Sequence, residues 1–340
     1  MTQKKYNIAI VGATGAVGQE MINILDERKF PVGDLFPLAS ENSLGKTVSF
    51  RGQDLRVDIP GEEVFKKTDI ALFSAGNAIS QEYAPIAAGC HAVVIDNSSA
   101  FRMEPDIPLV VPEVNPDEIK NYKNRGIIAN PNCSTIQLVV VLNPLHQRYS
   151  LKRAVVATYQ STSGAGSEAM DELSAQTLAL FSNKEIKNSV FKHRIAFNLI
   201  PQIDVFLADG STKEEAKLVN ETKKILGDKN ILVTATAVRV PVFYSHSEAV
   251  NLEFNTKINI EEVRKILSNA PGVTVMDDPS NFEYPMPVFT SGKDDVYVGR
   301  IRRDETIANG LNLWVVADNL RKGAALNAVQ IAERLIAEHL

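Results

Sequence analysis

The sequence predicts an α/β protein in which a mostly parallel sheet in the N-terminal part is followed by a second domain of α+β texture. Up to about residue 132, short and uniformly apolar runs alternate with helix-like segments, which is the pattern of a parallel sheet covered on both faces. Beyond residue 133 the β-rich runs become longer and the helical segments less regular. The chain has 340 residues, 44% of them hydrophobic, and is therefore long enough for two cores.

A glycine-rich turn follows the first strand. Tyr6–Val11 runs into Gly12-Ala13-Thr14-Gly15-Ala16-Val17-Gly18, and a helical pattern begins directly afterwards. Glycines let the backbone approach a pyrophosphate, and a helix N-terminus favours anions, so this order opens a Rossmann-type dinucleotide-binding domain. The spacing is G-x-x-G-x-x-G instead of G-x-G-x-x-G, and a purely structural turn is the alternative. The candidate cofactor residues here are Gly12, Thr14, Gly15, Ala16 and Val17.

The second strand, Asp34–Ala39, ends in a polar loop where such a domain meets the adenosine ribose. An acidic residue there suits a ribose 2′-hydroxyl, and basic or hydroxyl groups suit a 2′-phosphate. The loop contains both kinds of residue, so the choice between NAD and NADP stays open on this evidence. Its candidate residues are Ser40, Glu41, Asn42 and Ser43, with Lys46 further on.

Two more buried strands, Asp69–Phe73 and Ala92–Asp96, repeat the alternation, and the apolar run Leu109–Val111 leads to a strand that ends before Cys133. Ligands of parallel sheets bind at the carboxyl ends of the strands. The residues expected at these ends are Ser74, Ala75, Gly76, Arg102 and Cys133.

Cys133 lies where a Pro turn gives way to an apolar helix that runs to about Tyr149. Asn132 is a good N-cap residue, and the positive end of the helix dipole favours the thiolate, which is the nucleophilic form of cysteine. Free cysteine is also often buried as a small hydrophobic residue. The local sequence alone leaves a nucleophile and a structural cysteine equally open.

The C-terminal part contains long β-rich runs interrupted by helices, and it ends in an amphipathic helix through Ala324 and Leu335 that is expected to pack on the first domain. The predicted dinucleotide-binding domain is therefore 1–132 plus about 319–340, and the second domain is 133–318. The expected strands are 152–161, 231–241, 246–253, 296–303 and 310–318, and the expected helices are 166–182, 212–226 and 260–269.

Composition excludes several classes of protein. The formal net charge is -5 with no basic face, so nucleic-acid binding is not expected. Cys90 and Cys133 are the only cysteines, which excludes a disulfide framework and a paired-cysteine metal motif and suits a reducing cytoplasm. The basic start passes directly into a strand, and no apolar run approaches membrane-spanning length. An untargeted cytoplasmic protein without a metal is expected.

Several motifs together resemble the aspartate-β-semialdehyde dehydrogenase family from end to end. Their order along the chain makes coincidence an unsatisfactory explanation. They are the glycine turn 12–18, Asn130-Pro131-Asn132-Cys133-Ser134-Thr135, Tyr159-Gln160 with Ser163-Gly164-Ala165-Gly166, Glu214-Glu215-x-Lys217, and Val238-Arg239-Val240-Pro241 with His246-Ser247.

The resemblance implies a two-domain oxidoreductase whose second domain carries catalysis and dimerisation. Such an enzyme reversibly interconverts aspartate β-semialdehyde plus phosphate and β-aspartyl phosphate with NADP(H), in the biosynthesis of lysine, methionine and threonine. A homodimer is implied. The chemistry fits the residues: the Cys133 thiolate attacks the acyl phosphate, phosphate leaves, and hydride reduces the thioester through a thiohemiacetal. N–H donors around Asn132 and Cys133 are expected to stabilise the oxyanions.

The resemblance also assigns roles to single residues. His246 is implied as the acid/base, a task that a pKa near neutral suits, and Gln160 as the residue that orients the substrate. Arg239 is implied to bind the α-carboxylate bidentately. Glu214 is implied to bind the α-ammonium. Arg102 and Lys217 are implied to bind phosphate, and Ser163, Gly164 and Asn319 to lie by the nicotinamide.

Blander interpretations stand beside these assignments. Glu214 and Lys217 are spaced as a surface i,i+3 ion pair, and the residues near the nicotinamide suit ordinary turns and caps. Related enzymes often carry Arg or Lys at the positions that correspond to 41–43, whereas the first basic residue of this loop is Lys46. The expectation of NADP therefore rests on the resemblance and not on this loop. The rival functions are an N-acetyl-γ-glutamyl-phosphate reductase, which has no need of Glu214, and a non-catalytic nucleotide-binding paralogue.

Overall fold

A computed structural model describes residues 4–340, which divide into two compact units. The first unit holds the described residues up to Asn132 together with Ala324–Leu340, and the second unit is Cys133–Gly323. The C-terminal segment joins the first unit at Ala324, where a boundary at about 319 was expected. Asn319 therefore belongs to the second unit.

The first unit is built on a five-stranded parallel sheet in the order β2-β1-β5-β6-β7. This confirms the predicted parallel sheet, and β1 has the predicted bounds. The run at Leu109 forms only an isolated bridge to Ala129, because Pro108 and Pro112 on either side lack N–H donors. The elements are β1 (Tyr6–Val11), α1 (Ala16–Glu27), β2 (Val32–Leu38), β3 (Thr47–Phe50), β4 (Gln53–Arg56), α2 (Glu62–Phe65), β5 (Ile70–Phe73), α3 (Asn77–Gly89), β6 (Val93–Asp96), β7 (Ile127–Ala129) and α9 (Leu326–Glu338).

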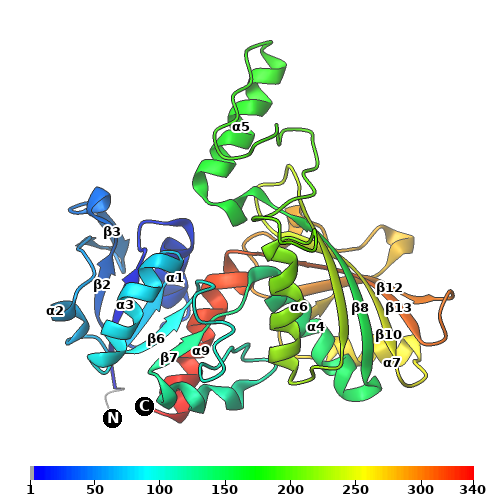
Figure 1. Cartoon of the computed structure of the whole chain (residues 1–340), viewed down its shortest axis with the longest axis horizontal. Helices are drawn as coiled ribbons and strands as arrows, with labels where there is room; N and C mark the ends of the chain where they lie inside the picture. The colour runs from blue at the N-terminus through cyan, green and yellow to red at the C-terminus, as the bar shows by residue number, and fades with distance from the viewer. Residues whose placement is uncertain (1–3) are drawn as a thin grey trace. The chain divides into compact units, whose positions relative to one another are not determined.

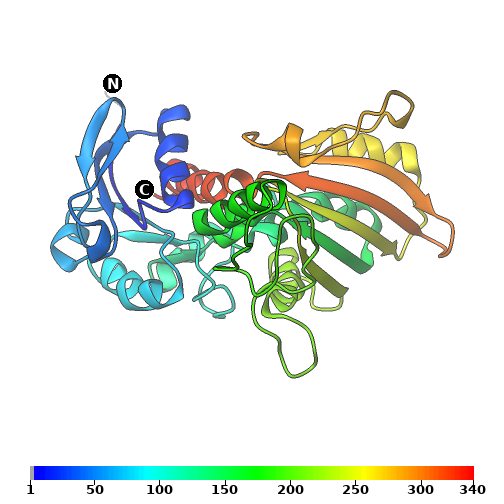
Figure 2. The ribbon, with the colours of Figure 1, turned by 90° about the horizontal axis from the view of Figure 1, so that it is seen from above.

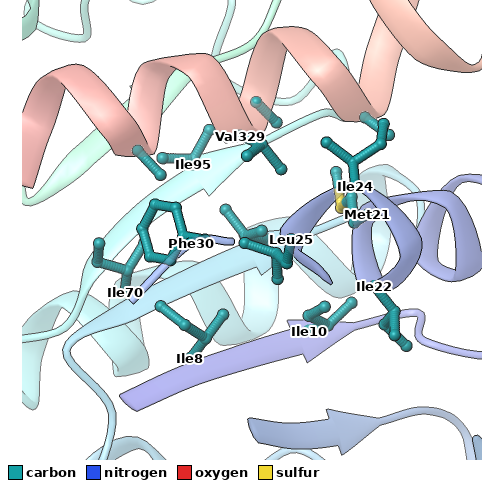
Figure 3. Packing of buried hydrophobic residues seen from close by; sticks show 14 of the residues in the cluster. Ile8, Ile10, Met21, Ile22, Ile24, Leu25, Phe30, Ile70, Ile95 and Val329 are labelled. Carbon is teal, nitrogen blue, oxygen red and sulfur yellow. The ribbon is translucent and has the colours of Figure 1, made fainter. Parts of the chain in front are cut away.

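Helices cover both faces of this sheet. Helices α1 and α9 lie on one face and α3 on the other (Figures 1 and 2). Figure 3 shows the core between the strands and helices α1 and α9. Ile8 and Ile10 of β1 face Leu25 of α1 there, and Val329 of α9 lies above them. The uniformly apolar strands are thus explained by burial, and α9 packs on the first unit as predicted.

Gly12 allows the turn after β1 to lie against the loop after β5. Its φ is +92°, and a Cβ placed on it would come within 2.8 Å of the main-chain oxygen of Ser74. The Gly12 N–H also donates to the Leu38 carbonyl at 2.8 Å. Glycine is therefore favoured at position 12 for two reasons: its φ is positive, and the main chain of Ser74 leaves no room for a Cβ.

We expect Gly12→Ala to lower the free energy of unfolding of the first unit by about 1–3 kcal/mol, because alanine is strained at this φ and its Cβ overlaps Ser74. Urea unfolding followed by circular dichroism measures the change. Gly45→Ala is the matched control: Gly45 has φ +78°, but no atom of the described chain lies within 4 Å of its Cβ position. Equal losses in the two variants would rule out the contact with Ser74 as a cause.

The second unit is built on a six-stranded mixed sheet in the order β11-β12-β13-β10-β8-β9, which agrees with the predicted α+β texture. Strands β8 and β9 are parallel, and β10 is antiparallel to both β8 and β13. The elements are α4 (Cys133–Tyr149), β8 (Leu151–Gln160), α5 (Ser167–Phe181), α6 (Lys213–Leu226), β9 (Leu232–Arg239), β10 (His246–Phe254), α7 (Ile260–Ser268), β11 (Val273–Val275), α8 (Pro287–Thr290), β12 (Val296–Asp304) and β13 (Gly310–Ala317).

Helices α4, α6 and α7 pack on this sheet and on one another, with α4 in contact with both α6 and α7. Helix α4 is buried along most of its length and begins at Cys133, as the sequence predicts. Helix α5 instead extends away from the sheet of its own unit (Figure 1). Within residues 4–340, no helix combines the length and the apolar character that a membrane crossing requires.

Candidate active site

The strand order of the second unit brings its polar motifs to one edge of the sheet. Gln160 at the end of β8 is paired with Arg239 at the end of β9, because these strands are parallel. Strand β10 runs antiparallel to β8, so its first residue, His246, lies at the same edge, opposite Ala317 at the end of β13. Motifs separated by up to about 160 residues along the chain thereby meet in one place.

Cys133 is the first residue of α4 and is half-buried. Its charge acts on the Arg239 guanidinium, which places these two residues within electrostatic reach of each other. The α4 N-terminus and a nearby guanidinium both favour the thiolate. Of the two interpretations that the sequence left open, this environment favours the nucleophile. Asn132, the residue before the helix, is buried.

Glu214 is held between Gln160 and Lys217. The Gln160 Nε2 donates to one Glu214 oxygen at 3.2 Å, and the Lys217 Nζ lies 3.0 Å from the other. Lys217 also contacts Asp204 at 2.9 Å. The i,i+3 pair therefore forms, but it is not a surface pair, since only 7% of the Glu214 side chain is exposed. Burial lowers the pKa of Lys217, but Glu214 and Asp204 outweigh it and raise that pKa overall.

Helix α6 positions Glu214 in its first turn. Thr212 and Glu215 form a capping box, in which the Thr212 hydroxyl accepts from the Glu215 N–H and the Glu215 carboxylate accepts from the Thr212 N–H. The second oxygen of Glu215 accepts the Ala237 N–H of β9 at 2.9 Å. The cap thus ties the start of α6 to the strand that carries Arg239.

Arg239 is buried, with 5% of its surface exposed. Its Nη1 donates to the Ser161 carbonyl at 2.6 Å, which orients the guanidinium. Burial lowers the pKa of Arg239, and the charges of Glu214 and Cys133 oppose that shift. A guanidinium does not lose its proton in proteins, so Arg239 remains a buried cation that suits a carboxylate ligand.

His246 is fully buried, and its Nδ1 accepts a hydrogen bond from the Ser161 N–H at 3.1 Å. Burial, reinforced by the positive charge of Arg239, lowers the pKa of His246 to about 3. A pKa near neutral had been expected for a proton relay. The difference arises because the sequence does not show that the ring loses all contact with water.

Arg102 belongs to the first unit, at the carboxyl edge of its parallel sheet. Its Nε donates to the Asn130 carbonyl and its Nη2 to the Asn97 carbonyl, each at 2.9 Å. The Asn130 side chain in turn donates to the Asn97 side chain at 2.7 Å. Two loops that follow β6 and β7 therefore hold this guanidinium in one orientation, although 28 residues separate Arg102 from Asn130.

The predicted cofactor residues of the first unit gather at the ends of β1, β2 and β5. Thr14 donates to the Ser43 hydroxyl at 3.3 Å, and the Lys46 Nζ donates to the same hydroxyl at 3.4 Å. Among the described residues no side chain caps α1, and its first turn has no acidic residue, which leaves its N–H groups suited to an anion. Ser40, Glu41 and Asn42 are exposed around this cluster, and Ser74, Ala75 and Gly76 form the turn after β5.

Ser163 and Asn319 contact each other in the second unit. The Asn319 amide donates to the Ser163 hydroxyl at 2.9 Å and accepts the Ser245 N–H at 3.0 Å. Gly164 lies beside the site: a Cβ on it would be 3.1 Å from the Arg239 Nη1 and from the His246 Nε2.

Ser161 and Asp204 are site residues that the sequence analysis missed. Ser161 follows Gln160 directly, so a polar residue one position beyond a proposed site residue was an available signal. Asp204 lies in an irregular segment and belongs to no motif, so the sequence carried no signal for it.

A cysteine at a helix start within electrostatic reach of a buried arginine, in a chain that also contains a nucleotide-binding type of α/β unit, is typical of an oxidoreductase that handles acyl groups. The chain matches two family models, "Semialdehyde dehydrogenase, NAD binding domain" over residues 7–122 and "Semialdehyde dehydrogenase, dimerisation domain" over residues 142–322. The aspartate-semialdehyde dehydrogenase of Aquifex aeolicus is 56% identical over 337 residues, which cover 98% of this chain and 99% of that protein. The chain belongs to the aspartate-β-semialdehyde dehydrogenase family, as its motifs predict.

Solved structures agree with this assignment. The crystal structure of aspartate semialdehyde dehydrogenase II from Vibrio cholerae, complexed with ASA, has a TM-score of 0.97 and 51% identity, covering 99% of this chain and all of that one. The aspartate semialdehyde dehydrogenase from Candida albicans, crystallised with NADP, has a TM-score of 0.77 and 26% identity, covering 98% of this chain and 99% of that one. Both comparisons confirm the predicted fold class.

Proposed function

We propose that this protein is an aspartate-semialdehyde dehydrogenase that reversibly converts β-aspartyl phosphate to aspartate β-semialdehyde and phosphate with NADP(H), in the biosynthesis of lysine, methionine and threonine. The observation that carries the proposal is the placement of Cys133 at the start of α4, within electrostatic reach of the buried Arg239. Family membership supplies the reaction type, and the residues around the cysteine supply the match to the substrate.

The chemistry starts at Cys133. In the reductive direction its thiolate attacks the acyl phosphate, the C–O bond to phosphate breaks, and a thioester forms. Bound NADPH supplies the hydride for reduction. The Cys133 thiolate then leaves from the thiohemiacetal as the carbonyl of the aldehyde forms. N–H groups at the start of α4, at Asn132 and Cys133, are placed to stabilise the oxyanions.

The second unit recognises the amino-acid part of the substrate. Arg239 binds the α-carboxylate, since it is a buried cation oriented by the Ser161 carbonyl. Glu214 binds the α-ammonium of the substrate. Gln160 orients the substrate beside it, since the Gln160 amide donates a hydrogen bond to the Glu214 carboxylate. An N-acetylated substrate has no ammonium for Glu214, which argues against the N-acetyl-γ-glutamyl-phosphate reductase alternative.

Arg102 in the first unit and Lys217 in the second are each assigned to phosphate binding, as the family resemblance implies. Main-chain carbonyls fix the Arg102 guanidinium in one orientation. Lys217 uses two of its N–H groups on Glu214 and Asp204 and keeps its third for a phosphate oxygen.

The residues of the first unit fit NADP(H). The uncapped N-terminus of α1 suits the pyrophosphate, and the cluster of Thr14, Ser43 and Lys46 offers two hydroxyls and one cation to the 2′-phosphate. Glu41 is exposed and does not enter the hydrogen bonds of that cluster. Ser163, Gly164 and Asn319 are assigned to the nicotinamide.

Lys46→Ala is expected to raise the KM for NADP⁺ by about 10- to 100-fold, which corresponds to one lost hydrogen bond to a charged group. The KM for NAD⁺ should stay close to that of the wild type, because NAD⁺ has no 2′-phosphate. Initial rates with both cofactors measure the two constants. Glu41→Ala is the control from the same loop and should not raise the KM for NADP⁺. Equal effects of Lys46→Ala on both cofactors would remove Lys46 from the 2′-phosphate site.

One steady-state assay tests the function itself. NADP⁺ reduction is measured with aspartate β-semialdehyde and with N-acetylglutamate semialdehyde, each with and without phosphate. Phosphate-dependent turnover of the first aldehyde is expected. Turnover of the second aldehyde alone would establish the reductase, and turnover of neither would favour the non-catalytic paralogue.

We also propose a homodimer formed through the second unit, whose matched family model is described as a dimerisation domain. We propose that the dimer forms through an apolar surface on and after α5. Three large apolar side chains there, Leu178, Phe181 and Phe197, are 64%, 80% and 64% exposed. The rings of Phe181 and Phe197 contact each other edge to face at 5.9 Å. Apolar groups gathered in this way are typical of an interface. Cys90 and Cys133 form no disulfide, and this fits the proposal of a cytoplasmic protein.

Phe181→Asp is expected to convert the dimer to a monomer, because it places a charge within that apolar surface. Sedimentation velocity measures the change. Phe282→Asp is the matched control in the same unit, since Phe282 is 79% exposed but belongs to a separate turn. A wild-type monomer, or a Phe181→Asp variant as dimeric as the control, would contradict the proposed interface.

A further inference from the structure

Thr158 is a fully buried residue of β8 that has no role in the mechanism described above. It lies two positions before Gln160, so both side chains are on the same face of the strand. The Thr158 Oγ1 is 3.0 Å from the Gln160 Oε1, and only 1% of Gln160 is exposed. Neither side chain can exchange this contact for water, so the hydrogen bond between them is part of how the site is built.

The contact with Glu214 determines which end of the Gln160 amide faces Thr158. Glu214 is ion-paired with Lys217 at 3.0 Å, and an ionised carboxylate only accepts hydrogen bonds. The Gln160 atom that lies 3.2 Å from Glu214 must therefore be the amide nitrogen, Nε2. The amide oxygen then faces Thr158, and the Thr158 hydroxyl is the donor between them. A reversed amide would bring two acceptors together at Glu214.

The residues paired with Thr158 on the neighbouring strands do not compete for its hydroxyl proton. On β9 its partner is Ala237, which has no polar side chain. On β10 its partner is Glu248, and neither carboxyl oxygen of Glu248 has a hydrogen-bond partner among residues 4–340. A β-branched side chain also has restricted freedom about χ1, which favours one placement of the hydroxyl. The Thr158 hydroxyl is therefore committed to Gln160.

The effect of this hydrogen bond extends beyond Gln160. The Gln160 Nε2 and the Lys217 Nζ hold the two oxygens of Glu214 from opposite partners, so the orientation of the amide also restrains the carboxylate. Thr158, Gln160, Glu214 and Lys217 form one chain of contacts across β8 and α6. The Thr158 hydroxyl begins this chain, and its loss would remove the restraint on the Gln160 oxygen.

We propose that Thr158 is a positioning residue for substrate binding, which holds the Gln160 amide with its nitrogen toward Glu214 and with its second N–H left for an acceptor oxygen of the substrate. The inference rests on the proposed function, in which Gln160 and Glu214 bind the amino-acid part of the substrate. Thr158 acts through Gln160 and is assigned no contact with the substrate. Without the hydroxyl, the buried Gln160 oxygen loses its donor, and the amide can rotate away from Glu214.

Two substitutions of Thr158 test this role. Thr158→Val removes the hydroxyl and keeps the branched shape, whereas Thr158→Ser keeps the hydroxyl and removes a methyl group. The measurement is the burst of NADPH from enzyme, NADP⁺ and aspartate β-semialdehyde without phosphate, which reports thioester formation. The limiting burst rate divided by the half-saturating aldehyde concentration should fall about 10-fold in Thr158→Val, the scale of one lost hydrogen bond, and stay within about 3-fold in Thr158→Ser. A Thr158→Ser variant as impaired as Thr158→Val would overturn the proposal.

A double-mutant cycle shows whether Thr158 acts through Gln160. In the Gln160→Ala background, Thr158→Val should have no further effect on the same ratio, because the amide that it positions is absent. An undiminished loss in that background would overturn the proposal. Thr222→Val is the matched control, since Thr222 is equally buried in the same unit but its hydroxyl has no hydrogen-bond partner within the described chain. It should leave the ratio unchanged; an equal loss there would show a general effect of valine and contradict a specific role of Thr158.

Exchange of the Gln160 side-chain amide measures the contact without turnover. In protein labelled with ¹⁵N-glutamine, the Gln160 NH₂ signals are assigned by their loss in Gln160→Ala. Their hydrogen–deuterium exchange should be equally slow in the wild type and Thr158→Ser, and about 10-fold faster in Thr158→Val. Equal exchange in the wild type and Thr158→Val would overturn the proposal. If the wild type gives no burst, the proposed function fails, and the exchange rates still decide whether Thr158 holds Gln160.

Discussion

Cys133→Ser is expected to lower kcat for phosphate-dependent NADP⁺ reduction by at least about 10⁴-fold, the scale seen when the nucleophile of a covalent mechanism is removed. A serine hydroxyl is not ionised at neutral pH, and the α4 N-terminus and Arg239 favour a thiolate that serine does not form. The burst of NADPH without phosphate should disappear as well. This separates loss of the nucleophile from slow release of product.

Cys90→Ser is the matched control for that variant. Cys90 is the other cysteine of the chain, and it follows α3 in the first unit. The control should retain nearly full turnover, and both variants should unfold like the wild type in thermal scans. A full burst from Cys133→Ser would show that another group carries the acyl intermediate.

Arg239→Lys is expected to reduce kcat/KM for the aldehyde by about 10²-fold, within the range of 2–5 kcal/mol for disturbing a buried charge pair. The guanidinium is anchored on the Ser161 carbonyl and still has N–H groups for a bidentate carboxylate contact. A lysine ammonium is a point charge on a flexible stem. It would be buried at the same position without the fixed bidentate geometry of a guanidinium. The loss should appear mainly in KM, because the carboxylate is bound equally in ground and transition states.

Arg153→Lys is the control for the arginine substitution. Arg153 lies near the other end of β8, where its Nη1 contacts Asn251 at 3.5 Å. Its replacement should leave kcat/KM for the aldehyde unchanged. A loss in Arg239→Lys that fell on KM for phosphate, with the aldehyde constants intact, would move Arg239 from carboxylate binding to phosphate binding.

The fold was largely predictable because its signals are local. The apolar run Tyr6–Val11 and the helix Cys133–Tyr149 have the bounds that their patterns predict. The hairpin of β3 (Thr47–Phe50) and β4 (Gln53–Arg56) was not predicted, since its residues are largely polar or exposed. Short strands of this kind are stabilised by their partner strand and carry little signal of their own.

The site was predictable only as a set of residues, and the contacts between them depend on strand order. Nothing local to Gln160 shows that β9 adds in parallel to β8 and brings Arg239 beside it. The low pKa of His246 has the same origin, because it follows from burial and from Arg239, which is another strand's residue. Ser161 was overlooked because its contribution to His246 is made chiefly by its main chain, which every residue has.

The grouping of Gln160, Glu214 and Arg239 inside one unit has a consequence for engineering. The groups assigned to the 2′-phosphate, Ser43 and Lys46, belong to the other unit, whereas those assigned to the amino acid are held by one sheet and its helices. Nucleotide preference and aldehyde selectivity are therefore independent design variables in this chain. A library confined to 40–46 should alter the first without retuning the second, and a change of substrate range has to be sought within 133–323.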